Sequence, residues 1–194
     1  NPQPGERILD CCAAPGGKSM YMAALMDNVG SLMSCDIHEH KIELMNSNAE
    51  RLGASIVHTK VQDATKLPDS WNAYFDRVLV DAPCSGLGIL QKKLDMRWRK
   101  QESILSELPP LQLAILERAA MTVKEKGYLI YSTCTLNYKE NEEVVEAFLQ
   151  KHKEFSIIPV AEDFPLKSNS GMITTYPPID DMDGFFMVKM QRIS

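Results

Sequence analysis

Two of the five cysteines stand where a thiol could do chemistry. Cys84 follows an Asp-Ala-Pro turn, and Cys134 stands between two threonines. Each comes at the end of an apolar run and among polar neighbours. Cys11 and Cys35 instead lie inside such runs, where a free Cys usually behaves as a small core hydrophobe. Cys84 and Cys134 are therefore the candidate nucleophiles.

A pair of thiols suits reactions at a carbon atom that needs activation. C5 of cytosine is too weak a nucleophile to take a methyl group from a sulfonium directly. A thiolate that adds to C6 makes C5 enamine-like, and later loss of the C5 proton lets the thiolate leave, so covalent catalysis divides one difficult step into easier ones. A carboxyl group near N3 and N4 would stabilise the developing charge, and Asp81 is placed for that role. Residue types alone leave open which thiol attacks.

A glycine-rich loop is the second chemical feature. It lies between a predicted strand and a predicted helix, where small residues and unpaired N–H groups let a ligand approach the backbone. A phosphate-binding loop needs G-x-x-x-x-G-K-[ST], but Cys12 occupies the position of the first glycine and Pro15 lacks an N–H. A nucleoside triphosphatase is therefore disfavoured. The loop residues are Cys12, Ala13, Ala14, Pro15, Gly16, Gly17 and Lys18.

Two acids follow at the ends of the next predicted strands. Asp36 comes 19 residues after Gly17, and an acid about 20 residues beyond the glycine loop is where nucleotide-binding sheets hold a ribose diol. Asp63 is placed to meet an adenine amino group. For a single Asp, a helix N-cap or a turn is the commoner role. Together with the loop, the two acids favour an adenosine without phosphates, as in S-adenosylmethionine.

Alternating strands and helices are expected to position these residues. Such alternation is typical of a parallel α/β sheet, whose ligands bind beyond the carboxyl ends of the strands. The loop, the acids and both candidate thiols all fall at those ends. We expect strands at 7–12, 31–36, 55–61, 75–81, 127–133, 155–160 and 184–190, helices at 18–26, 39–52, 110–124 and 140–152, and a loop-rich segment at 164–181.

Length and composition are those of one globular domain. The chain has 194 residues, of which 44% are hydrophobic and 24% charged, so it can bury enough surface without a disulfide or metal. The cysteines show no C-x-x-C spacing, and we expect no metal and reduced thiols in the cytoplasm. No apolar run is long enough for a membrane span. Because the chain starts without Met, we expect 1–194 to be a single catalytic domain of a longer protein, with an upstream RNA-binding region absent.

Four ordered sequence blocks carry a family resemblance. They are Asp10–Ser19 (DCCAAPGGKS), Asp81–Gly88 (DAPCSGLG), Ser132–Thr135 (STCT) and Asp183–Phe186 (DGFF). Together they resemble the RsmB/Nop2/Sun RNA cytosine-C5 methyltransferases over nearly the whole chain. The resemblance implies a Rossmann-like, class I S-adenosylmethionine-dependent methyltransferase fold. Such a fold has a mostly parallel seven-stranded sheet, helices on both faces and an antiparallel last strand.

The same resemblance implies roles at the site. Cys134 would attack C6, and Cys84 would assist resolution and release of the adduct. Asp81 and Lys18 complete the catalytic candidates. The cofactor-binding candidates are Cys12 to Lys18, Asp36, Asp63 and Asp81. We expect S-adenosylmethionine as the cofactor and a monomeric protein.

A basic stretch after the second block is the candidate RNA contact. Its members are Lys92, Lys93, Arg97, Trp98 and Arg99. Basic residues around an aromatic ring suit phosphate contacts and base stacking on single-stranded RNA, whereas the net charge of −5 argues mildly against nucleic acid. A solvated loop with a buried Trp is the alternative. Within the family the stretch is similar to that of bacterial 16S rRNA enzymes, although Leu94 replaces their usual Pro.

Methylation of C5 of a cytosine in RNA is thus the leading function, with 16S rRNA as the expected substrate. A tRNA methyltransferase of the same family is the first alternative. A catalytically silent RNA-binding module on the same fold is the alternative from another class. The presence of both Cys84 and Cys134 argues against that module.

Overall fold

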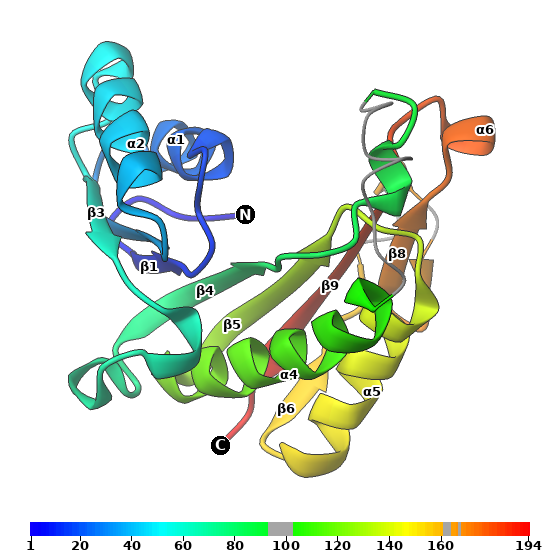
Figure 1. The fold of residues 1–194 in the computed structure, drawn as a ribbon. Coiled ribbons are helices and arrows are strands. Elements are labelled where there is room, and N and C mark those ends of the chain that lie inside the picture. The colour runs from blue at the N-terminus through cyan, green and yellow to red at the C-terminus, as the bar shows by residue number, and fades with distance from the viewer. Residues whose placement is uncertain (93–102, 161–163, 167) are drawn as a thin grey trace.

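Nine strands form one mixed sheet in the part of the chain that the structure describes (Figure 1). This part comprises residues 1–92, 103–160, 164–166 and 168–194 of a computed structural model. Four of the RNA-binding candidates, Lys93, Arg97, Trp98 and Arg99, lie outside the described residues. Their predicted role therefore stays a prediction.

Strands and helices follow one another along the described residues. The strands are β1 (Arg7–Asp10), β2 (Ser31–Asp36), β3 (Val57–Val61), β4 (Phe75–Asp81), β5 (Val123–Thr133), β6 (Phe155–Ile157), β7 (Ser168–Asn169), β8 (Met172–Thr175) and β9 (Phe185–Arg192). The helices are α1 (Gly17–Leu25), α2 (Glu39–Leu52), α4 (Ile104–Thr122), α5 (Glu142–Lys151) and α6 (Pro177–Asp180), with short 3-10 turns η1 (Ala64–Lys66), η2 (Asp69–Trp71), η3 (Leu87–Ile89) and η4 (Tyr138–Glu140). None of the described helices is long and apolar enough to cross a membrane.

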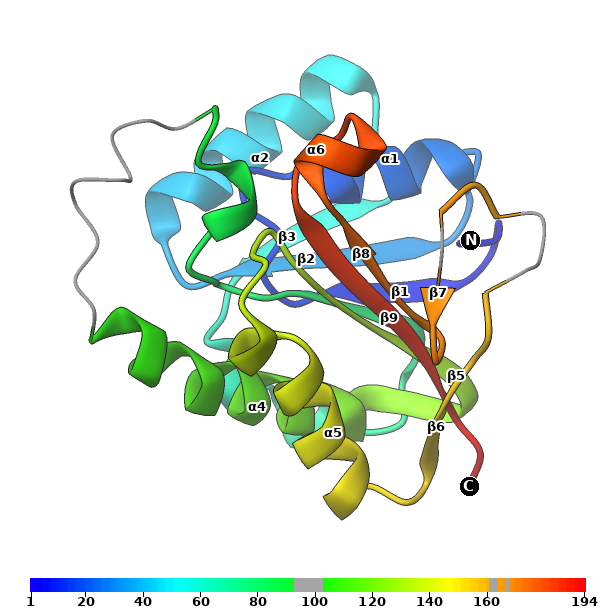
Figure 2. The same ribbon diagram turned by 90° about the vertical axis from the view of Figure 1, so that its right-hand side faces the viewer.

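The first five strands are parallel and follow the order β3-β2-β1-β4-β5. The apolar runs of the central strands are buried, as Ile8 and Leu9 of β1 and Val78 and Val80 of β4 show by exposures of at most 1%. Helices α1 and α2 cover one face of the sheet, and α4 and α5 cover the other (Figure 2). The Rossmann-like fold expected from the sequence is confirmed.

The last strand, β9, lies antiparallel to β5, as expected. Its outer edge is shared, because β8 pairs with Phe185–Val188 and β6 with Met190–Arg192. The predicted count of seven strands is wrong, since β7 and β8 form a hairpin inside the segment 164–181 that we expected to be loop. These strands have only two and four residues, too few to show an alternating pattern, and the prolines nearby indicated a loop.

The chain leaves β1 for neighbours on opposite sides, β2 and β4. This arrangement creates the switch point beyond which open α/β sheets bind ligands. β1 leads into the glycine-rich loop, β2 ends at Asp36, β4 ends at Asp81, and β5 runs directly into Cys134. The chemical candidates therefore share one edge of the sheet, as predicted.

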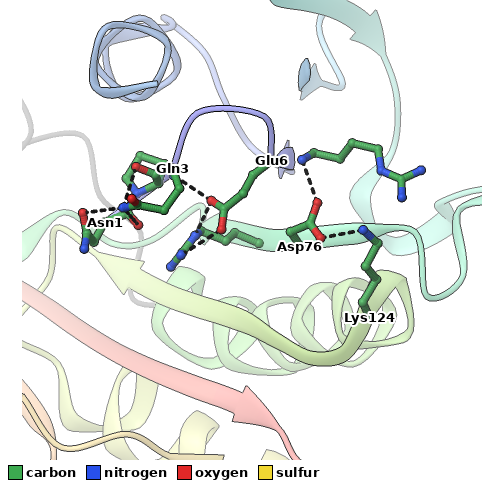
Figure 3. A network of polar contacts seen from close by, with 8 residues as sticks. Asn1, Gln3, Glu6, Asp76 and Lys124 are labelled. Carbon is green, nitrogen blue, oxygen red and sulfur yellow. Dashed lines mark hydrogen bonds and ion pairs between the residues drawn. The ribbon is translucent and has the colours of Figure 1, made fainter. Parts of the chain in front are cut away.

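A polar network fastens the N-terminal segment at the opposite edge (Figure 3). Arg77 of β4 donates to both carboxylate oxygens of Glu6, at 2.6 and 2.9 Å. Asp76 accepts a hydrogen bond from the backbone N–H of Arg7 at 2.8 Å and pairs with Lys124 near the start of β5. These contacts thus link strands β1, β4 and β5 near their first residues, and the site lies at the opposite ends of the same strands.

Candidate active site

A pocket of about 520 Å³ opens at the carboxyl edge of the parallel strands. The predicted site residues that line it are Cys12, Ala14, Asp36, Asp63, Asp81, Cys84 and Cys134. Ala13 to Gly16 form the turn before α1, Gly17 begins that helix, and Lys18 joins the site through an ion pair with Asp81. Lys92 lies elsewhere, with its side chain 72% exposed and its ammonium 2.7 Å from Asp183. The structure thus brings the cofactor and thiol candidates together and leaves Lys92 outside the pocket.

The two candidate thiols face each other across the ends of β4 and β5. Their Sγ atoms are 3.2 Å apart, both thiols are free, and the backbone N–H of Cys134 donates to Cys84 Sγ at 3.3 Å. A hydrogen bond from Cys84, helped by the Lys18 ammonium, lowers the pKa of Cys134 to about 7, although burial and Asp81 act the other way. The same hydrogen bond raises the pKa of Cys84 far above its usual range. Cys134 is therefore the thiol that ionises more readily, and the thiolate is the reactive form.

We expect the rate of alkylation of Cys134 by iodoacetamide to rise with pH through a midpoint near 7. The thiolate fraction grows as the pH passes the pKa from below. Mass spectrometry of the Cys134 peptide after brief exposures at a series of pH values measures this midpoint. In Cys84→Ala, which lacks the donor, the midpoint should move toward the ordinary thiol value of about 8.5. The same midpoint in both proteins would contradict the role of the hydrogen bond.

Both oxygens of the Asp81 carboxylate have a partner in the site. Lys18 Nζ donates to Oδ2 at 2.8 Å, and Ser132 Oγ donates to Oδ1 at 2.8 Å. Lys18 also lies over the Phe185 ring, 5.0 Å from its centroid. These contacts fix the orientation of the carboxylate, and each oxygen keeps a lone pair that can accept an N–H group from a base.

Asp36 and Asp63 each combine a local role with a place in the pocket. Asp36 Oδ1 accepts the backbone N–H of His38 at 3.0 Å and lies 3.7 Å from Lys41 Nζ. Burial acts to raise the pKa of Asp36, but the His38 contacts and Lys41 lower it. Asp63 caps η1, because the N–H and the hydroxyl of Thr65 both donate to its Oδ1. The turn roles are thus present, and within the described residues the hydrogen bonds of Asp36 all go to Oδ1, which leaves Oδ2 for a ligand.

Two glycines let three segments meet behind Cys134. Gly88 N–H donates to the carbonyl of Cys134 at 3.0 Å, and Gly184 N–H donates to the carbonyl of Gly88 at 2.9 Å. A Cβ on Gly88 would lie 2.0 Å from the carbonyl oxygen of Gly184. Because that oxygen belongs to the backbone, it cannot turn aside. The second and fourth sequence blocks therefore depend on glycine where they touch.

Gly88→Ala is expected to destabilise the fold by roughly 1–3 kcal/mol, the usual cost of overpacking a close contact. Each kcal/mol lowers the Tm of a domain of this size by about 2–4 °C, which thermal unfolding followed by circular dichroism detects. Gly17→Ala is the matched control, because a Cβ there meets no atom within 4 Å. Equal losses in the two variants would show that the Gly88 contact is not the cause.

A buried acid beneath the glycine-rich loop was missed in the sequence. Asp10 Oδ2 accepts from Ser19 Oγ at 2.7 Å, and Ser19 in turn accepts from Ser34 Oγ at 2.8 Å. Burial raises the pKa of Asp10 to about 7, and its Oδ1 has no partner among the described residues. These bonds tie β1 and β2 to the first turn of α1 and so support the loop. An acid inside an apolar run, as in Arg7–Cys12 (RILDCC), is the signal that could have marked it.

The sequence of the chain is similar to those of known methyltransferases. The family model described as 16S rRNA methyltransferase RsmB/F matches residues 1–191. The chain is 42% identical to the probable ribosomal RNA small subunit methyltransferase B of Bacillus subtilis, over 99% of this chain and 44% of that protein. It is 40% identical to the protein of the same name from Synechocystis sp., again over 99% of this chain and 44% of the relative.

A solved structure has the same fold as this chain. NSun6 from Pyrococcus horikoshii, determined with SFG, matches at 30% identity with a TM-score of 0.88, over 100% of this chain and 49% of that one. The chain thus spans less than half the length of each of these three proteins. The class I methyltransferase fold and its cofactor, S-adenosylmethionine, are confirmed. By its sequence, its fold and its pocket, the chain belongs to the 16S rRNA methyltransferase RsmB/F family.

Proposed function

We propose that the chain carries the active site of an enzyme that transfers a methyl group to C5 of a cytosine in 16S rRNA. The thiol pair carries this proposal, because two sulfur atoms 3.2 Å apart lie beside the Asp81 carboxylate in one pocket. Methylation of an exocyclic amine needs no thiol, whereas the C5 reaction needs one to attack C6 and gains from a second during release. The names of the relatives, which refer to the small ribosomal subunit, support the substrate.

The pocket fits S-adenosylmethionine, which supplies an electrophilic methyl group when bound. Its volume of about 520 Å³ lies in the range usual for small-molecule sites. Asp36 would offer Oδ2 to the ribose hydroxyls, and Asp63, just after β3, would accept a hydrogen bond from the adenine amino group. Gly16, with φ 101°, takes a backbone conformation that glycine adopts readily, and a Cβ there would lie 3.1 Å from the Met45 side chain.

The ionisation of the thiols sets the order of events at the base. The Cys134 thiolate forms a bond to C6, and the electron pair of the C5–C6 double bond shifts into the ring. Asp81 accepts a hydrogen bond from the N4 amino group, and Lys18 keeps that carboxylate in place. C5 has thereby become electron-rich enough to take the methyl group.

Release of the product falls to the second thiol. Once Cys134 Sγ is bonded to C6 it no longer carries charge, so the main cause that raises the pKa of Cys84 disappears. Cys84 can then give its proton to solvent and take the C5 proton as the C6–S bond breaks. Cys134 leaves as a thiolate and Cys84 ends as a thiol, as at the start. Because both thiols must stay reduced, we place the reaction in the cytoplasm.

Transfer of tritium from labelled S-adenosylmethionine to 16S rRNA tests the proposal, with bisulfite sequencing to locate 5-methylcytosine. The full-length protein is used, and tRNA is the parallel substrate. We expect one methylated cytosine or more in 16S rRNA and none in tRNA. Methylation of tRNA alone would show that tRNA, and not 16S rRNA, is the substrate. RNA binding without methyl transfer to either RNA would favour the catalytically silent RNA-binding module.

Asp36→Ala is expected to weaken S-adenosylmethionine binding by roughly 2–4 kcal/mol, since charge-assisted hydrogen bonds to the ribose are lost. This corresponds to a rise in Kd of about 30-fold to 1,000-fold, which calorimetry measures. Asp69→Ala serves as the control, because its side chain is 90% exposed and lies outside the pocket. Asp36→Asn keeps the shape and should also bind weakly. A change below about threefold in both Asp36 variants would refute the ribose assignment.

A further inference from the structure

A buried carboxylate that the reaction does not use lies behind the two thiols. Glu140, the last residue of η4, is fully buried and accepts three N–H groups. Its Oε2 accepts from the backbone of Ser85 at 2.8 Å and from Gln112 Nε2 at 3.0 Å, and its Oε1 accepts from Asn137 Nδ2 at 3.0 Å. Burying a carboxylate is costly unless hydrogen bonds compensate it. Its place in the core therefore calls for an explanation beyond packing.

The contacts of Glu140 and Gln112 fall on either side of Cys84. Glu140 holds the N–H of Ser85, the residue after the thiol. Gln112, a fully buried residue of α4, donates from Nε2 to the carbonyl of Pro83, the residue before it, at 2.9 Å. The two side chains also bond to each other. The backbone of the Cys84 loop is thus held on both sides.

The next residue in the chain does the same for Cys134. Asn141 Oδ1 accepts the hydroxyl of Thr133 at 2.6 Å, and Asn141 Nδ2 donates to the carbonyl of Thr135 at 3.0 Å. These threonines flank Cys134 in sequence. A direct link between the loops completes the network, because the hydroxyls of Ser85 and Thr135 are 2.7 Å apart. Two consecutive residues, Glu140 and Asn141, therefore form hydrogen bonds to the loops of both thiols.

We infer that Glu140 and Asn141 are positioning residues that hold the Cys84 and Cys134 sulfur atoms within hydrogen-bonding distance of each other. This inference rests on the proposed function for its meaning in catalysis, but not for its test. Hydrogen bonding between the sulfur atoms is steep in distance, so a loosened loop separates the donor thiol from its acceptor. Loss of these hydrogen bonds would give Cys134 the pKa of an ordinary thiol, while every group proposed to touch the base remains.

Glu140→Gln is the sharpest variant. It preserves size but replaces an acceptor oxygen by an NH2 group, which must face N–H donors. We expect a protein that folds but in which alkylation of Cys134 at pH 7 is roughly tenfold slower, as its midpoint moves from near 7 toward the ordinary value of about 8.5. Glu143→Gln, on the exposed side of α5 three residues along, is the matched control and should leave the midpoint unchanged.

Alkylation needs no RNA and no cofactor, so this test stands even if the proposed methylation fails. A melting temperature that falls while the pH profile of Cys134 stays unchanged would show a merely structural role and overturn the inference. If Glu140→Gln does not fold, Asn141→Ala decides instead, because it removes both hydrogen bonds to the residues that flank Cys134 and leaves Glu140 in place. A shift of the midpoint in Asn141→Ala toward the ordinary thiol value supports the inference. An unchanged midpoint in a folded Asn141→Ala refutes it.

Discussion

Cys134→Ala is expected to abolish both methyl transfer and the covalent protein–RNA adduct. The thiolate that bonds to C6 is gone, and Cys84 is not expected to replace it, because burial still raises the pKa of the Cys84 thiol when Cys134 is absent. The rate should fall by roughly ten-thousandfold or more, the scale on which removal of a covalent nucleophile acts. Tritium transfer from labelled S-adenosylmethionine to substrate RNA measures the rate, and denaturing electrophoresis shows the adduct.

Cys35→Ala is the control for loss of a thiol as such. Cys35 is fully buried in β2, with a pKa raised to about 12 by burial, and it takes no part in the pocket. This variant should keep its activity at a small cost in stability. Cofactor binding should survive in Cys134→Ala, so that a loss of activity is not mistaken for a loss of the pocket. Residual methylation above a few per cent would contradict Cys134 as the attacking group.

Cys84→Ala is expected to trap the adduct instead. The Cys134 thiol can still bond to C6, though more slowly near neutral pH, because its hydrogen-bond donor is absent. The group that takes the C5 proton is then missing, so the methylated base stays attached. A protein–RNA band that survives denaturation should accumulate over successive minutes, while released product falls at least about a hundredfold, the usual scale for loss of a general base.

The order of the two thiols is what this pair of variants decides. Raising the pH should speed formation of the adduct in Cys84→Ala, because more of Cys134 is ionised, without restoring release. The mirror-image result, with an adduct trapped by Cys134→Ala and none by Cys84→Ala, would reverse the assignment. An adduct in neither variant would mean that both thiols are needed before the bond to C6 can form.

The edge of the sheet could be predicted well because its signals are local. Apolar runs of β-branched residues mark β4, and each run ends in a polar residue that the strand must deliver at its carboxyl end. Asp36, Asp81 and Cys134 could therefore be placed together from the order of segments alone. The family resemblance predicts which thiol attacks, and the pKa of Cys134, lowered by the hydrogen bond with Cys84, supports that prediction.

The supports of the site could not be predicted, because they depend on contacts between distant segments. Gln112 reads in the sequence as an ordinary polar residue of a helix, and only the packing of α4 brings it to Pro83. Glu140 lies in an acidic stretch where a solvated surface is the plain expectation, yet it is fully buried. The β7–β8 hairpin was not predicted for another reason. Its pairing depends on the free edge of β9 rather than on a pattern in its own residues.

The low pKa of Cys134 belongs to no single segment of the chain. Its hydrogen-bond donor stands 50 residues away, and contacts of such separation form late because long loops cost entropy to close. A nascent chain therefore carries five unremarkable thiols, and the reactive one appears only when β4 and β5 lie side by side. The amount of fast-reacting thiol per mole of protein therefore measures the fraction of correctly folded molecules. A chain that loses its fold would also lose the reactive thiol that we propose to bond to RNA.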